Sequence, residues 1–292
     1  MKKFLIFCAV LMFTAVVSVV AEPVKIVAAI PDLGSIASYI GGEKAEVVSI
    51  AKNNSNPHFV EVLPSYMIKV LKGDIYLKAG LSLDQWSNEI IDGSRNNKII
   101  VADCSNGIVV LQKPVGKVDS SMGDVHPEGN PHYWLDPENG IVIASNILAA
   151  LKKADSLNSA YYESNFEKFK NETKMRIAVW KDKMSGLSGK KMISYHSSWV
   201  YFASAFNMVI AGYVEPLPGI PPTGKHLSEL VNIIKKDKVS LLIQEPYFPD
   251  NAPKFLERQT GIKVFKIAPS CTNVKADSYF KHFDEAIAQI TK

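Results

Sequence analysis

Cysteine is scarce in this sequence, with only Cys8, Cys104 and Cys271 among 292 residues. None of them stands close to another, so the paired-thiol spacing of structural zinc sites is absent. The same scarcity excludes a small fold held together by several disulfides. Cys104 and Cys271 either form one disulfide or remain two separate buried thiols, and the sequence alone leaves both options open.

The chain also lacks a strong excess of one charge and a second long hydrophobic run. Its 33 basic and 29 acidic residues give a formal net charge of +4 at pH 7. No basic cluster stands out, so nothing indicates nucleic-acid binding. After residue 20, no apolar stretch is long enough to cross a membrane as a helix.

The first 21 residues are typical of a secretory signal peptide. Two lysines stand near the start, an apolar run covers 4–20, and a small residue, Ala21, precedes Glu22. The alternative is an uncleaved membrane anchor, but the run is at the short end for a spanning helix. A lipid-anchored protein would need a cysteine where Glu22 stands. We therefore predict that residues 1–21 are removed and that the mature chain diffuses freely in the periplasm.

Short β-branched runs alternate with helical patterns along the rest of the chain. The predicted strands are 25–30, 45–51, 74–80 and 98–103 in the first half, and 191–196, 208–213, 239–245 and 264–269 in the second. The predicted helices include 33–40, 64–71, 197–206, 227–236 and 277–290. This alternation predicts an α/β protein with parallel sheets flanked by helices.

A long helical region separates the two series of strands. Asp136 and Pro137 fit the N-cap and the first position of a helix that runs to about residue 154. A longer helix follows, and no flexible linker accompanies it. We therefore predict two lobes, 22–157 and 187–292, joined by one rigid linking helix over 158–186.

Three of the six histidines stand at similar places in this pattern. His58 follows the second predicted strand, His196 ends the first strand of the second half, and His132 stands shortly before Pro137. Asp277 follows the last strand by one loop. Open parallel sheets bind ligands beyond the C-terminal ends of their strands. Three imidazoles and a carboxylate from two lobes would therefore suit a divalent transition metal such as zinc in the cleft.

Longer motifs surround these residues. They are Asn56-Pro57-His58, Asn130-Pro131-His132-Tyr133-Trp134-Leu135-Asp136-Pro137, Tyr195-His196, Glu215-Pro216-Leu217-Pro218-Gly219-Ile220-Pro221-Pro222 followed by His226-Leu227-Ser228-Glu229-Leu230, and Asp277-Ser278-Tyr279. In this order they resemble the motifs of the cluster A-I metal-binding receptors of ABC importers, the TroA-like family. The resemblance spans the predicted mature chain, and the stretch 130–137 is its most specific element.

The resemblance implies a binding protein rather than an enzyme. It implies one metal ion per chain, bound by His58, His132, His196 and Asp277, and delivery of that ion to the membrane permease of an ABC importer. We also expect a monomer. Manganese receptors of the family typically carry glutamate at the position of His196, so this chain is expected to prefer zinc, although some relatives with three histidines and an aspartate carry manganese.

Two features depart from the commonest pattern of the family. The loop before the second ligand is short and holds few candidate ligands: Asp119, Asp124, His126 and Glu128. We predict that 112–130 is a mobile surface loop and that His126 is solvated, with transient recruitment of metal by His126 as the alternative. Phe59 stands where an acidic residue often follows the first histidine.

Four further residues have roles that the sequence can suggest. His226 is predicted to be structural and His282 to lie on the surface. Glu215 and Glu245 each end a predicted strand, so either is a candidate partner that orients a ligand histidine.

Two other function classes remain as alternatives. A zinc hydrolase would need an open coordination position and a general base, and the sequence has neither a His-Glu-x-x-His motif nor a Gly-x-Ser-x-Gly turn. An adhesin or a periplasmic metal chaperone could use the same fold, although the absence of a lipid anchor disfavours an adhesin.

Overall fold

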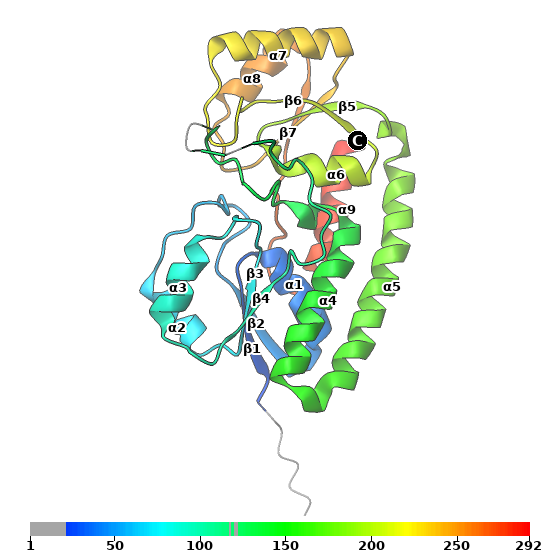
Figure 1. Cartoon of the computed structure of the whole chain (residues 1–292). Coiled ribbons are helices and arrows are strands. Elements are labelled where there is room, and N and C mark those ends of the chain that lie inside the picture. Colours follow the sequence, from blue (N-terminus) through cyan, green and yellow to red (C-terminus); the bar gives the residue numbers. More distant parts are fainter. Residues whose placement is uncertain (1–21, 117, 120–121) are drawn as a thin grey trace, which may run out of the picture.

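The computed structural model describes residues 22–116, 118–119 and 122–292 (Figure 1). The predicted signal peptide, 1–21, lies outside the described residues and stays a prediction. Within the described residues, no helix is both long and apolar enough to cross a membrane. Cys104 and Cys271 are both buried and both free, so the structure supports two separate thiols.

The first sheet has four parallel strands in the order β2-β1-β3-β4. These strands are β1 (Val24–Ala28), β2 (Ala45–Ser49), β3 (Ile75–Lys78) and β4 (Ile100–Asp103). The helices associated with this sheet are α1 (Pro31–Gly41), α2 (Pro64–Leu71) and α3 (Trp86–Ser94). Central residues such as Ile26, Val27 and Tyr76 are buried on both faces, as expected for a parallel sheet covered by helices.

The second sheet repeats this topology in the order β6-β5-β7-β8, again with all pairs parallel. These strands are β5 (Lys191–Ser194), β6 (Val209–Tyr213), β7 (Leu241–Gln244) and β8 (Lys263–Lys266). The helices associated with it are α6 (Val200–Ala205), α7 (Gly224–Asp237) and α8 (Asn251–Thr260). The predicted fold class, two parallel sheets flanked by helices, is confirmed.

Two consecutive helices connect the halves. Helix α4 (Pro137–Ala154) begins as predicted, because the Asp136 side chain accepts a hydrogen bond from the backbone N–H of Glu138. Helix α5 (Ser159–Lys183) has 25 residues and is therefore about 37 Å long. In Figure 1 it extends along both halves of the molecule. The long linking helix is therefore present, while the lobe boundaries themselves stay a prediction.

The C-terminal helix α9 (Ser278–Ile290) does not pack only on the second half. It contacts α1 and α5, and its Phe280 and Phe283 join the core that contains the first sheet. The indole N–H of Trp180 on α5 donates to Asp284 on α9 at 2.8 Å. The prediction that His282 lies on the surface is wrong: its side chain is buried, and burial lowers its pKa to about 4.

Candidate metal centre

His58 lies in the loop after β2, and its position is set by short-range bonds. The carboxamide oxygen of Asn56 accepts a hydrogen bond from the backbone N–H of His58 at 3.0 Å, which folds the chain into a tight turn. The indole N–H of Trp86 donates to the carbonyl of Pro57 at 3.0 Å and fastens this turn to α3. The motif Asn56-Pro57-His58 therefore fixes the position of the His58 imidazole.

His132 is placed by the same type of turn. The side-chain oxygen of Asn130 accepts from the backbone N–H of His132 at 3.0 Å, and it lies 3.1 Å from Nδ1 of the same residue. Asn130 also donates to the carbonyl of Ser197 at 2.7 Å, so it joins the two halves beside the site. Two aromatic residues that follow anchor this segment: Tyr133 donates to the carbonyl of Ala79, and Trp134 donates to that of Pro269.

His196 comes from the second half, just beyond the C-terminal end of β5. Its Nδ1 lies 2.7 Å from Oε2 of Glu215, and both side chains are buried. Its Nε2 is buried and has no hydrogen-bond partner among the described residues. The Glu215 carboxylate therefore selects the tautomer with hydrogen on Nδ1 and leaves Nε2 free to bind a ligand. Of the two predicted candidates, Glu215 is therefore the one that bonds to His196.

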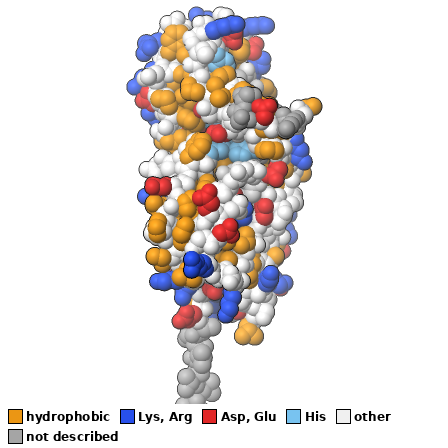
Figure 2. Space-filling view, turned by 60° about the vertical axis from the view of Figure 1, so that its left-hand side comes forward, with side chains coloured by type: hydrophobic (Ala, Val, Ile, Leu, Met, Phe, Trp, Pro, Cys, Tyr) orange, Lys and Arg blue, Asp and Glu red, His pale blue; other side chains and the backbone are white. Residues whose placement is uncertain are grey.

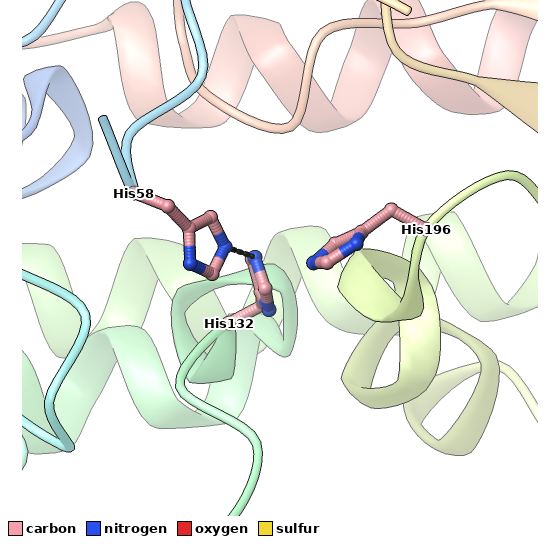
Figure 3. Close-up of side chains that lie close together, drawn as sticks. All are labelled: His58, His132 and His196. Carbon is pink, nitrogen blue, oxygen red and sulfur yellow. Dashed lines mark hydrogen bonds between the residues drawn. The ribbon is translucent and has the colours of Figure 1, made fainter. Parts of the chain in front are cut away.

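The three rings point toward one another from separate segments (Figure 3). Nε2 of His58 and Nε2 of His132 lie 3.2 Å apart, and one nitrogen from each of the three residues lies within 4.8 Å of the others. Ligand atoms in a tetrahedral zinc site with bonds of about 2.0–2.1 Å are roughly 3.3 Å apart. The pair from the first half already has this spacing, and a small approach of His196 would complete it. The geometry therefore fits a transition-metal ion.

Burial lowers the pKa values of the His58 and His132 imidazoles. Desolvation and the neighbouring imidazoles hold the pKa values of His58 and His132 well below the ordinary value of 6.5. Both rings are therefore neutral at neutral pH, which is the state that binds metal. In the space-filling view, histidine surface is visible between the upper and lower parts of the molecule (Figure 2).

Comparison with known proteins places this arrangement in a family. A family described as "Zinc-uptake complex component A periplasmic" matches residues 26–292. The chain belongs to this family of metal ABC transporter substrate-binding proteins. The resemblance to the TroA-like metal receptors is thereby confirmed.

Curated relatives of the family match most of the chain. The metal ABC transporter substrate-binding lipoprotein SloC of Streptococcus mutans is 27% identical over 263 residues, covering 85% of this chain and 82% of the relative. The manganese ABC transporter substrate-binding lipoprotein PsaA of Streptococcus pneumoniae is 26% identical, covering 84% and 79%. A crystal structure of ZnuA superposes with a TM-score of 0.80 at 23% identity, covering 92% of this chain and 98% of that one, and so shares the fold.

The family motif Asp277-Ser278-Tyr279 does not bring its carboxylate to the histidines. Asp277 stands at the N-cap of α9, where its side chain is 53% exposed and lies 2.5 Å from the ammonium of Lys281. Among the described residues, the three histidines form the one group of His, Cys, Asp and Glu side chains with metal-binding spacing. The structure therefore gives no support to Asp277 as the fourth ligand. Its place at a helix N-terminus beside a lysine accounts for the position of the carboxylate.

His126 is not the solvated loop residue that its sequence context suggests. It is half-buried, and its Nε2 lies 3.2 Å from Nδ1 of His58. Burial lowers the pKa of His126 to about 4. Nor is 112–130 only a surface loop, because the backbone N–H of Asp124 donates to the carbonyl of Pro218 in the second half at 2.8 Å.

The structure also places three other residues that the sequence singles out, His226, Glu245 and Phe59. His226 is structural as predicted: its backbone N–H bonds to the N-cap Thr223 of α7, and its Nε2 donates to the carbonyl of Tyr213. Glu245 follows β7 directly and is fully buried. Burial raises the pKa of its carboxyl to about 7, although the nearby His196 partly opposes this rise. Phe59, at the position where relatives often carry an acid, is largely exposed next to His58.

Proposed function

We propose that this chain captures a divalent transition metal, zinc in first place, outside the cytoplasm and delivers it to the permease of an ABC importer. The observation that carries the proposal is the cluster of three imidazoles contributed by both halves of the chain, two of which, His58 and His132, have pKa values well below the ordinary value. Family membership supports the transport role, since this is a family of substrate-binding components. The permease and the metal ion are the expected partners of a monomeric receptor.

We propose His58, His132 and His196 as the protein ligands. Asp277 is left out, because its carboxylate lies on the surface and pairs with Lys281. The fourth position then falls to water or to a side chain that moves on binding. A cavity of about 540 Å³ beside the cluster, lined by His58, His126, Ser82 and Asp124 among others, offers the ion a route from solvent.

The donor set favours zinc over manganese. Nitrogen donors of intermediate softness suit zinc, whereas manganese prefers carboxylate, carbonyl and water oxygens. No carboxylate belongs to the clustered ligand atoms among the described residues. The relative PsaA, whose name specifies manganese, and the zinc-uptake family description indicate that the family includes both metals.

Three histidines with a free fourth position also occur in catalytic zinc sites, so an enzyme is the competing proposal. The family consists of substrate-binding proteins, and this supports a binding role without turnover. Incubating the zinc-loaded protein with esters and peptides, with and without a chelator, separates the two proposals. Metal-dependent hydrolysis would replace the transport proposal with a zinc hydrolase.

The direct test measures which metal the protein holds. Elemental analysis of the protein as isolated should find about one zinc per chain, and zinc should displace manganese in a competition titration. His226→Gln is a matched control, because it removes a histidine that lies outside the cluster and should not change either result. Tighter binding of manganese than of zinc would contradict the preference for zinc. Failure to bind either metal would contradict the whole proposal.

A further inference from the structure

Each ligand histidine in the cluster has a side-chain partner on its Nδ1. His132 has the oxygen of Asn130 at 3.1 Å, and His196 has the carboxylate of Glu215 at 2.7 Å. Metal-binding histidines commonly donate their second ring N–H to an oxygen acceptor, which fixes both the tautomer and the ring orientation. His58 follows the same scheme, but its partner is a nitrogen: Nε2 of His126 at 3.2 Å.

We propose that His126 is a positioning residue for His58, accepting the Nδ1 hydrogen and thereby presenting Nε2 of His58 to the metal. This inference rests on the proposed function, since it assumes that His58 binds the ion through Nε2. It assigns to a residue of the 112–130 loop a specific role at the centre without making that residue a ligand.

The other ring nitrogen of His126 makes this assignment consistent. An interaction with the backbone of Ser82 favours the hydrogen-bearing imidazole of His126, although burial lowers its pKa overall. Because Nε2 faces His58, Nδ1 is the ring nitrogen left to carry the hydrogen of neutral His126. Nε2 of His126 is then an acceptor, as the proposal requires.

The turn that contains Leu81 and Ser82 has an unusual backbone conformation. Leu81 and Ser82 both lie in the left-handed region, with φ of 49° and 61°, which is rare for residues other than glycine. The backbone N–H groups of Ala79 and Gly80, just before this turn, both donate to the buried carboxylate of Asp84. Ser82 of this turn lines the same cavity as His58 and His126.

The alternative is that His126 is itself a fourth ligand, and direct spectroscopy separates the two roles. We would load the protein, with its histidines labelled with ¹⁵N, with ¹¹³Cd²⁺ and record metal–nitrogen scalar couplings. The proposal expects coupling to Nε2 of His58, His132 and His196, hydrogen on Nδ1 of His58, and no coupling to either nitrogen of His126. Coupling to His126 would overturn the positioning role. If His58 itself showed no coupling, the proposed function would fail first.

Two substitutions test the hydrogen bond by rescue. His126→Leu keeps most of the bulk but has no acceptor, and it should weaken zinc binding by about 10–100-fold, the usual cost of losing an outer partner. His126→Gln retains an acceptor oxygen and should recover most of the affinity. His226→Gln, which lies outside the cluster, should bind zinc as the unmodified protein does. Zinc affinity of His126→Leu equal to that of the unmodified chain would overturn the proposal, as would equal losses in the Leu and Gln variants.

Discussion

The two halves of the molecule have the same sheet topology, but they contribute to the histidine cluster by different means. The first half supplies two histidines from loops, and an asparagine two residues earlier in the chain fixes each of them. The second half supplies one histidine from a strand end, fixed by Glu215, 19 residues further along the chain. Placement in the first half therefore depends mainly on local sequence, whereas placement in the second half requires the folded sheet.

The largest expected effect comes from removing a ligand of the first half. His132→Ala should weaken zinc binding by more than about 100-fold, because loss of an outer partner alone costs about 10–100-fold. The fold should persist, since Asn130, Tyr133 and Trp134 keep their own bonds. Competition with a chromophoric chelator measures the affinity, and circular dichroism checks the fold. Unchanged affinity would remove His132 from the site.

The second-largest effect is expected from removing Glu215, the long-range partner of His196 in the second half. Glu215→Leu should weaken zinc binding by about 10–100-fold, because His196 loses the carboxylate that fixes its tautomer. Glu215→Gln keeps an acceptor of the same length and should lose less. The same titration measures both variants. Equal affinities in the Leu variant and the unmodified protein would show that burial alone orients His196.

The pH dependence should be weaker than that of a solvent-exposed three-histidine site. Unperturbed imidazole has a pKa of about 6.5, so such a site loses affinity as the pH falls through about 6. In the folded protein, the pKa values of His58 and His132 are well below 6.5, so protons begin to compete only in more acidic solution. Zinc titrations between about pH 7.5 and about pH 5 should show nearly level affinity first and a decline afterwards. A steep decline beginning above pH 6.5 would contradict the burial of these two rings.

The smallest effect is expected at Asp277, a residue outside the histidine cluster. Asp277→Asn removes one side of an exposed i,i+4 pair with Lys281, which contributes only about 0.3–0.5 kcal/mol to stability. Zinc affinity should therefore stay within about twofold of the unmodified value. A loss comparable to that of His132→Ala would restore Asp277 as a ligand, brought in by movement of the loop before α9.

The sequence predicts the features that depend on short-range pattern. All eight strands and the long linking helix appear where β-branched runs and helical periodicity place them. The three clustered histidines could be predicted because strand ends and the Asn-Pro-His motifs mark them. Helix α8 is not among the helices named from the sequence; its Pro253 falls in the first turn, where the missing N–H of proline has no cost.

Features that depend on tertiary packing could not be predicted in the same way. His126 looks solvated because its loop is polar, and only the folded chain shows that it rests against His58. His282 stands on an amphipathic helix whose other side also becomes buried, because α9 packs against the first half as well. Asp277 stays a prediction of the family motif, because in the folded chain its carboxylate is half-exposed and pairs with Lys281 rather than facing the histidines.

Helices α5 and α9 contact each other, and both pack on the core that contains the first sheet. Both lie along the same side of the molecule and bond to each other through Trp180 and Asp284. Near the histidines the halves meet through several hydrogen bonds between loops, such as Asp124 to Pro218 and Asn130 to Ser197. If a permease distinguishes the loaded receptor from the empty one, it would do so at the surface around these loops, where an ion bound by the three histidines would add bonds that link the two halves.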